Sequence, residues 1–365
     1  MARTPFAPVT PWVLRWARDD AGLSVGAVAK RADVKPDVVV AWEDAQAQPT
    51  LAQLRHFADA VRRPVAFFFT ADPPESHAAM PPDYRSASGV PSPDLRREIR
   101  KAQERRESFR ELEAAVAWEP PSDLEGFDAI REWLGVGVTE IAETADPGTA
   151  LKVWIGAVED RGALVFQMSG IGTQECRGFS LADPTCPVIV LNGADAPQAR
   201  SFTLLHEVAH LLGREGGMCL LQDEVAVERR CNQVAAEILM PAKVIRQAAQ
   251  TLAGRALVDD LVRIFRVSSQ AAAFRLRDLD LLSQAVVDEV IERARDAARR
   301  AESREQSGGP LHYVLARRNL GDRYISAVLD ALHSDAITLT DATYLLDERV
   351  GTLERLEQSL AGGRR

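Results

Sequence analysis

Apolar residues in the first seventy positions recur in short groups at helical spacing, with turn residues between the groups. Ser24 and Thr50 stand directly before two of the groups, where a side-chain oxygen can cap a helix. Pro36 lies in the first turn of another group, where its missing N–H has no cost. The pattern predicts five short helices, over residues 12–21, 25–31, 35–42, 51–61 and 65–69.

The pattern of residues changes at position 71 and again at position 93. Residues 71–92 hold five prolines among serines and alanines and show almost no periodicity, which indicates a linker or an extended arm. Residues 93–117 are rich in arginine and glutamate but keep an apolar stripe from Leu95 to Val116. This second pattern predicts a long charged helix.

Helical and strand-like patterns mix between residues 120 and 250. We predict helices over 127–134, 150–160, 196–212 and 224–239, and short strands over 164–168, 178–181 and 188–191. Shorter helices are expected over 243–281, a charged helix over 285–305 and a small helical unit over 311–360. The predicted fold class is therefore mainly α with a small β-sheet (α+β).

Composition narrows the class of protein. The 365 residues are enough for two or three domains, and 46% apolar with 27% charged residues is ordinary for a soluble globular protein. The net charge of −9 argues against nonspecific coating of nucleic acid by the whole molecule. There is no apolar run long enough for a membrane helix, and Met1–Thr10 lacks the features of a secretory signal. The four cysteines show no CxxC spacing and are expected to be reduced thiols. We expect a cytoplasmic protein without a membrane partner.

The strongest chemical signal is SFTLLHEVAHLL, at residues 201–212. In this HExxH pattern His206 and His210 lie one turn apart on the same helix face, so both imidazoles can reach one ion. Glu207 lies beside them and can take a proton from a water molecule at the metal. Zinc suits this use because it binds imidazole well and lowers the pKa of a bound water to about 7. Manganese and iron also accept these ligand types.

The apolar flanks of this motif make it informative. Burying two histidines and a carboxylate among leucines without partners would cost several kcal/mol. The alternatives are a chance match on a surface helix and a structural zinc site. A structural site has no use for Glu207, which is placed as a general base.

A catalytic zinc needs a third protein ligand and an open position. The downstream helix offers Glu224, Glu228 and Glu237. We favour Glu228, which follows His210 by eighteen residues, because this spacing lets a second helix return alongside the first. Asn232 comes one turn after Glu228 and is expected to hydrogen-bond a ligand histidine.

These motifs together resemble a known family. The runs PVIVLN, FTLLHEVAHLL and ERRCNQVAAEILMP, with PPDYR at 81–85, are similar to motifs of the ImmA/IrrE metallopeptidases over roughly residues 80–280. The resemblance implies a gluzincin-like domain in which His206, His210 and Glu228 bind the metal and Glu207 is the catalytic base. It also implies that the substrate is a repressor protein, whose cleavage derepresses stress, DNA-damage or mobile-element genes. Arg230 and Cys231 depart from the Glu-Ala that many members have before the asparagine.

Residues 11–70 resemble a second family, the Xre/Cro helix-turn-helix proteins, including the frequent Trp-Glu pair at Trp42 and Glu43. The resemblance implies double-stranded DNA or a DNA-bound repressor as partner. In such motifs the start of the recognition helix meets the bases, which here is Lys35, Asp37 and Val38. Residues 1–70 hold nine Lys/Arg against seven Asp/Glu, a weak basic footprint. A module for docking a repressor or for forming a homodimer therefore remains the alternative.

The predicted domains follow from both resemblances: an Xre-type head over 1–70, a linker over 71–92, a peptidase domain over 93–283, a connector helix over 284–309 and a C-terminal helical unit over 310–365. Residues 265–281 fit either a second helix-turn-helix-like hairpin or, as we favour, a packing element of the peptidase domain.

Two other function classes stay open: a transcription regulator with a structural or sensory metal, and a fused toxin–antitoxin or defence component. Tyr84, Arg177 and His312 are all candidates for stabilising an oxyanion.

Overall fold

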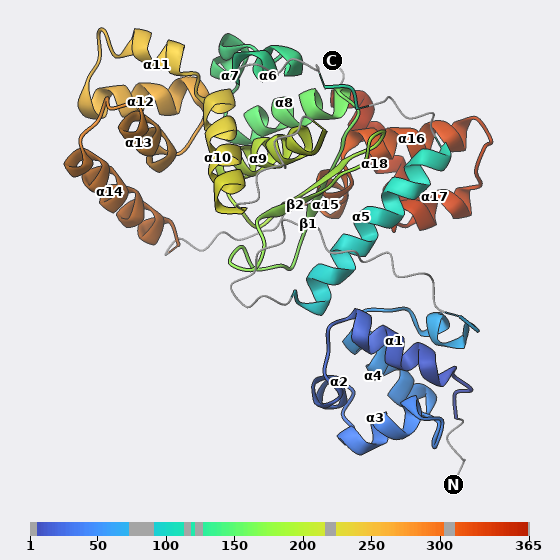
Figure 1. The fold of residues 1–365 in the computed structure, drawn as a ribbon. Helices are drawn as coiled ribbons and strands as arrows, with labels where there is room; N and C mark the ends of the chain where they lie inside the picture. The colour runs from blue at the N-terminus through green and yellow to red at the C-terminus, as the bar shows by residue number, and fades with distance from the viewer. Residues whose placement is uncertain are drawn as a thin grey trace. The chain divides into compact units, whose positions relative to one another are not determined.

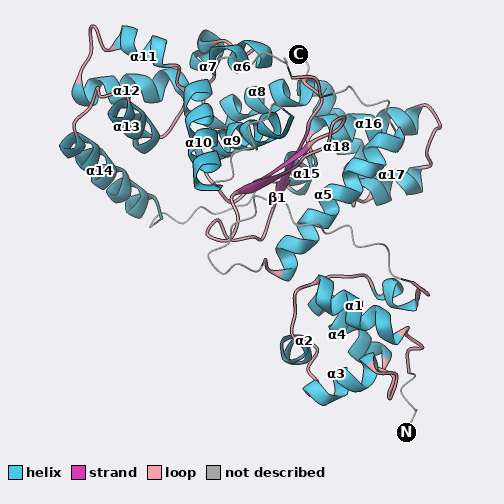
Figure 2. Cartoon of the chain, viewed as in Figure 1, coloured by secondary structure: helices cyan, strands magenta, loops and turns pink. Residues whose placement is uncertain are grey.

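The computed structural model describes residues 6–72, 91–112, 118–120, 127–215, 224–302 and 311–363. It is mostly helical with one three-stranded sheet (Figures 1 and 2), which confirms the predicted fold class. The chain forms two compact units. Unit 1 is Met1–Glu104 with Gly170–Cys176, and unit 2 is Arg105–Ser169 with Arg177–Arg365. None of the described helices has the length and apolarity that crossing a lipid bilayer requires.

The helices of unit 1 lie where the sequence predicts them. They are α1 (Pro11–Asp20), α2 (Val25–Arg31), α3 (Pro36–Glu43), α4 (Leu51–Val61) and the 3-10 helix η1 (Val65–Phe69). Ser24 caps α2 by accepting a hydrogen bond from the backbone N–H of Ala27 at 3.2 Å, and Thr50 and Gln53 form a capping box on α4. The caps explain why these short segments begin where they do.

Ion pairs hold the polar residues of unit 1 in place around its apolar core. Arg18 binds the buried Glu43 of α3 at 2.7 Å, and the Asp20 carboxylate accepts from Arg63 at 2.9 Å and from Arg100 at 3.0 Å. Arg100 lies on α5 (Pro93–Leu112), which contributes its residues up to Glu104 to this unit. The predicted linker is described only at residues 71–72 and 91–92; its remainder, 73–90, lies outside the described residues.

The sheet of unit 2 has the order β1-β3-β2. Its strands are β1 (Leu164–Met168), β2 (Gly178–Leu181) and β3 (Val188–Asn192), and all three match the predicted runs to within one residue. Strand β3 pairs in parallel with β1 and antiparallel with β2. The parallel ends of β1 and β3 therefore open on the same edge, next to the start of α9 (Pro197–Glu215).

Both faces of the sheet are covered, which explains why its strands are nearly all apolar. On one face Val165 belongs to the core that α8 (Pro147–Asp160) and α9 share. On the other face the ring of Phe166 lies 5.6 Å from that of Tyr324, on α16 (Asp322–His333), and the Arg105 guanidinium lies 5.2 Å from it. Figure 1 shows α8 and α9 on one side of the sheet and α15 and α16 on the other.

The remaining helices of unit 2 extend this core. They are α6 (Phe127–Leu134), α7 (Val138–Glu143), α10 (Glu224–Leu239), α11 (Ala242–Ala248), α12 (Gly254–Phe265), α13 (Ser269–Asp278) and α14 (Gln284–Glu302). The short α7 was not predicted. Buried Ala272, Ala273 and Leu276 of α13 share the core with α9 and α10, which supports the packing interpretation of residues 265–281.

Four helices form the C-terminal part: α15 (His312–Leu320), α16, α17 (Leu339–Leu346) and α18 (Val350–Gly363). Between α15 and α16 the chain turns at Gly321, with φ of +75°. A Cβ at this position would lie 2.6 Å from the Val165 carbonyl oxygen and 2.9 Å from the Glu159 carboxylate. Only glycine lets the turn approach β1 and α8 so closely.

This close contact buries Glu159, and burial governs its protonation. The side chain is 7% exposed; loss of solvent and the charge of Asp322 raise its pKa from 4.5 to about 8, against the opposing charge of Arg323. A carboxyl with a raised folded-state pKa contributes stability that is complete below about pH 4.5 and is lost as the pH rises through about 8.

Glu159→Gln is therefore expected to remove a pH-dependent loss of unfolding free energy of order 3–5 kcal/mol between pH 4.5 and 9. Denaturant unfolding at several pH values measures it, with the exposed Glu143→Gln as control. Parallel pH profiles for wild type and Glu159→Gln would contradict the expectation.

Candidate metal centre

The HExxH residues lie in the middle of α9, and Glu228 lies near the start of α10. The two helices pack against each other, as the spacing between the motifs predicts. Apolar residues of α9 before and within the motif, including Leu204, Leu205 and Val208, are fully buried in the core of unit 2. Packing of these residues fixes the direction in which the histidines project.

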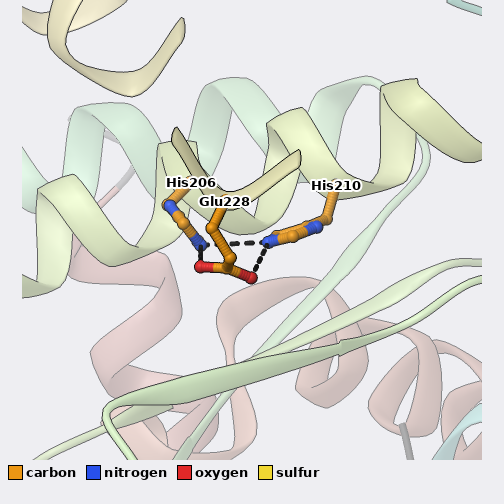
Figure 3. Close-up of side chains that lie close together, drawn as sticks. All are labelled: His206, His210 and Glu228. Carbon is orange, nitrogen blue, oxygen red and sulfur yellow. Dashed lines mark hydrogen bonds and ion pairs between the residues drawn. The ribbon is translucent and has the colours of Figure 1, made fainter. Parts of the chain in front are cut away.

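Three side chains meet at one point (Figure 3). The Nε2 atoms of His206 and His210 are 3.0 Å apart. The Glu228 carboxylate places one oxygen 3.6 Å from His206 Nε2 and the other 3.4 Å from His210 Nε2. Figure 3 shows the carboxylate reaching toward the two rings from the second helix.

These distances fit one tetrahedral ion. Ligand atoms about 2.0–2.2 Å from a zinc ion at tetrahedral angles are about 3.3–3.6 Å from one another. The observed separations of 3.0, 3.4 and 3.6 Å lie close to that range. Two imidazoles and one carboxylate are a ligand set that catalytic zinc sites use. The donors present therefore fit a divalent metal ion such as zinc.

Exposure differs around the triangle of donors. The side chain of His210 is 2% exposed, that of His206 15% and that of Glu228 25%. The ring of Phe202, one turn before His206, stacks beside the imidazole with centroids 6.3 Å apart. The site is closed on the His210 side and reaches solvent on the side of His206 and Glu228.

The electrostatics of His210 favour a positive charge at this point. Burial by itself lowers its pKa, but hydrogen bonds with Cys231 and Glu228 and the charge of Glu207 outweigh burial and raise the pKa to about 10. The surrounding carboxylates thus create a negative potential that a cation can neutralise.

Glu207 is buried, at 6% exposure, and lies near enough to His210 to influence its charge. It is not a member of the three-residue donor group. Glu207 is therefore a buried carboxylate next to the three candidate donors and separate from them.

Asn232 is exposed, whereas the buried Cys231 on the same helix forms a side-chain hydrogen bond with His210. The reason is the rotation of about 100° per residue along a helix. The buried stripe of α10 runs through Cys231, Val234 and Ile238, with Glu228 at its edge and Asn232 beyond that edge. Cys231 stands three residues after Glu228, which was the signal available in the sequence.

The other candidates are engaged elsewhere or lie outside the described residues. Glu237 pairs with Arg275 and accepts the Ala242 N–H at 2.7 Å. Arg177 pairs with Asp195 at 3.3 Å, and His312, 75% exposed, with Glu348 at 3.5 Å. Tyr84 and the side chain of Glu224 lie outside what the structure describes. Lys35 and Asp37 are exposed on unit 1, and Val38 is half-buried.

The contact between Cys231 and His210 has a measurable consequence. Cys231→Ala is expected to lower zinc affinity about tenfold, because a ligand histidine loses the partner that orients its ring. Asn232→Ala, on the exposed side of the same helix, is the matched control and should bind zinc as wild type does. Competition with a chromophoric chelator measures both. Equal affinities of the two variants would show that the contact does not support the ligand.

Comparison with known proteins finds a family model that matches this part of the chain. Residues 158–277 match the model of the IrrE N-terminal-like domain, and the matched segment contains the sheet, α9 and α10. This segment belongs to that domain family. Two curated proteins called radiation response metalloprotease IrrE are each 36% identical over 107 residues, which is 26% of this chain. The protein from Deinococcus radiodurans is covered over 32% of its length and that from Deinococcus deserti over 38%.

The chain thus spans about a third of the length of these relatives. The crystal structure of Bacillus thuringiensis PlcR in complex with the peptide PapR7 and DNA overlaps 81% of this chain and 96% of its own, at 11% identity. Its TM-score of 0.16 is too low to indicate a shared fold.

Proposed function

We propose that the protein is a zinc-dependent endopeptidase that cuts a transcriptional repressor. The observation that carries the proposal is the triangle of His206, His210 and Glu228 with the buried Glu207 beside it. The membership of residues 158–277 in the IrrE N-terminal-like family supports it, and so does the name metalloprotease given to both relatives. Manganese or iron in place of zinc would use the same ligands.

The metal ligands and Glu207 have different roles in the proposed reaction. Zinc, when bound by the three donors, supplies a Lewis acid that polarises the scissile carbonyl and acidifies a water molecule. Glu207 takes a proton from the attacking water and delivers it to the leaving amine. Its burial keeps the carboxylate oriented and away from competing solvent. The partial exposure of His206 and Glu228 leaves the side from which a peptide can approach.

The main competing function is a transcription regulator whose metal is structural or sensory. Such a site needs ligands but no buried carboxylate next to them. Glu207 is a carboxylate at 6% exposure on α9 beside the candidate donors, and a catalytic proton transfer accounts for its position there.

A repressor is the proposed substrate because the HExxH and ERRCNQ motifs resemble those of the ImmA/IrrE peptidases. Co-expression with Xre-type repressors encoded beside the gene, with and without DNA damage, tests this. We expect one repressor to be cut at a single site by wild type and to stay intact with Glu207→Gln. If every repressor stays intact in all conditions, the assigned substrate class is wrong.

Unit 1 is proposed to dock a protein partner and to contribute little sequence reading of DNA. Most of its arginines are used internally: Arg18 binds Glu43, and Arg63 and Arg100 bind Asp20. At the start of α3, where a recognition helix meets bases, the exposed residues are Lys35, Pro36 and Asp37. A single lysine beside an aspartate is a poor base reader.

The DNA affinity of the full-length protein should therefore be weak, with a dissociation constant of about 1 µM or higher at physiological salt and no preference for operator over random duplex. Mobility-shift titrations at several salt concentrations measure both quantities. A preference of a thousandfold or more for one sequence, abolished in Lys35→Ala, would contradict the docking role.

A further inference from the structure

Two arginines of unit 2 lie at the carboxyl end of β1, and neither forms an ion pair with a carboxylate of the described residues. Arg200 projects from the first turns of α9, and Arg318 from α15. The charge of Arg318 is close enough to affect Arg200. Both side chains are half-buried, so solvent reaches them. We call Arg200 and Arg318 the arginine pair.

Within the described part of the chain, the hydrogen bonds of the arginine pair are to neutral groups. Arg200 Nη1 donates to the Gln167 side-chain oxygen at 2.5 Å, and its buried Nε has no acceptor among the described residues. Arg318 donates to Asn319 at 3.0 Å and to the Ser169 hydroxyl at 3.2 Å. Gln167 and Ser169 are two residues apart at the end of one strand, about 7 Å, which brings the guanidinium groups to neighbouring positions.

Several other partly buried arginines of this chain pair with a carboxylate, whereas Arg266 donates to the backbone carbonyl oxygens of Ala142 and Thr144. Arg18 binds Glu43, Arg275 binds Glu237 and Arg317 binds Asp322. For the arginine pair, no described carboxylate lies within ion-pair distance. Asp195 acts on Arg200 only through its charge, and its carboxylate already accepts from Arg177 and from the Ala196 N–H.

The position of Arg200 in its helix makes its positive charge still less favourable. Arg200 lies in the first turns of a 19-residue helix, where the macrodipole disfavours a cation. Burial and the charge of Arg318 lower the pKa of Arg200, and burial lowers that of Arg318. Two like charges held together in a partly desolvated place are stabilised when an anion binds between them.

We propose that the arginine pair binds an oxyanion, a phosphate or carboxylate group, at the carboxyl end of β1. Both guanidinium groups would donate charge-assisted hydrogen bonds to it. Because Arg200 lies on the HExxH helix and Arg318 on α15, the anion would also tie the C-terminal helices to the helix that carries the metal ligands. The site does not depend on peptidase activity.

Titration of the full-length, EDTA-treated protein with inorganic phosphate and with acetate, at constant ionic strength set by potassium chloride, tests the proposal. Removing metal ensures that phosphate binding to a metal ion at the histidines does not contribute. We expect saturable binding by calorimetry and a rise in melting temperature with at least one of the two anions. Phosphate alone would identify a phosphorylated ligand, and acetate alone a carboxylate ligand.

Variants test whether anion binding depends on the arginine pair itself or only on the total positive charge of the protein. Arg200→Gln and Arg318→Gln should each weaken anion binding at least tenfold, whereas Arg263→Gln, at an exposed arginine of α12, should change it less than twofold. Arg200→Lys keeps the charge and should retain part of the affinity. The proposal is overturned if wild type binds neither anion saturably, or if Arg263→Gln weakens binding as much as the variants of the pair.

Discussion

Glu207→Gln is expected to lower the rate of repressor cleavage by about 10²–10⁴-fold. Glutamine keeps the shape of the side chain but cannot accept the proton of the attacking water. The three metal donors are untouched, so the variant should hold as much zinc as wild type. Single-turnover cleavage followed on gels, together with metal analysis of the same samples, measures both quantities.

The matched control is Glu132→Gln, the same substitution at an exposed position on α6. It should cleave at the wild-type rate. If Glu207→Gln retained wild-type cleavage with full zinc content, another group would have to serve as the base, and the proposed role of Glu207 would be wrong.

Glu228→Ala is expected to weaken zinc binding more than about 100-fold, beyond the effect of a residue that only orients a ligand. It removes the one donor that comes from α10, and the two histidines of α9 remain as an incomplete set. Cleavage should be lost together with the metal. Dialysis against buffered zinc followed by elemental analysis gives the affinity.

Glu237→Ala tests whether Glu237, on the same helix as the proposed ligand Glu228, has a structural role and does not bind the metal. Glu237 and Arg275 form a pair whose side chains are 15% and 10% exposed, so its loss leaves a nearly buried guanidinium. We expect a stability loss of order 2–4 kcal/mol with zinc affinity unchanged. The opposite pattern, zinc lost from Glu237→Ala and kept in Glu228→Ala, would exchange the roles of the two glutamates.

The sequence predicted that His206, His210 and Glu228 come together because the information needed for this prediction is local. His206 and His210 are related by a single helical turn, and the apolar residues around them fix which face is buried. Helix α10 was predicted with its observed bounds, which placed Glu228 opposite the motif. The HExxH spacing needed no knowledge of the rest of the fold.

Predictions that depended on rotation or long-range packing were less successful. Asn232 and Cys231 are adjacent in sequence, and choosing between them requires the direction of the buried stripe of α10. Helix α7 is only six residues long, too short for a periodic signal. The contact of Gly321 with Glu159 joins segments 162 positions apart (321 − 159), and nothing in either segment indicates the other.

The same limit applies to the arginine pair. Arg200 and Arg318 meet because α15 packs against β1, whereas their local sequences resemble those of ordinary surface helices. The pattern of the head, by contrast, was local, and its five helices were predicted almost residue by residue. Capping residues and the periodicity of apolar positions were enough there.

The most direct test of the metal centre is anomalous diffraction from crystals of the zinc-loaded protein, collected on both sides of the zinc edge. The account predicts one peak per chain, about 2.0–2.2 Å from Nε2 of His206, from Nε2 of His210 and from a carboxylate oxygen of Glu228. A peak bound by other residues, or none at these three side chains in zinc-saturated crystals, would contradict it.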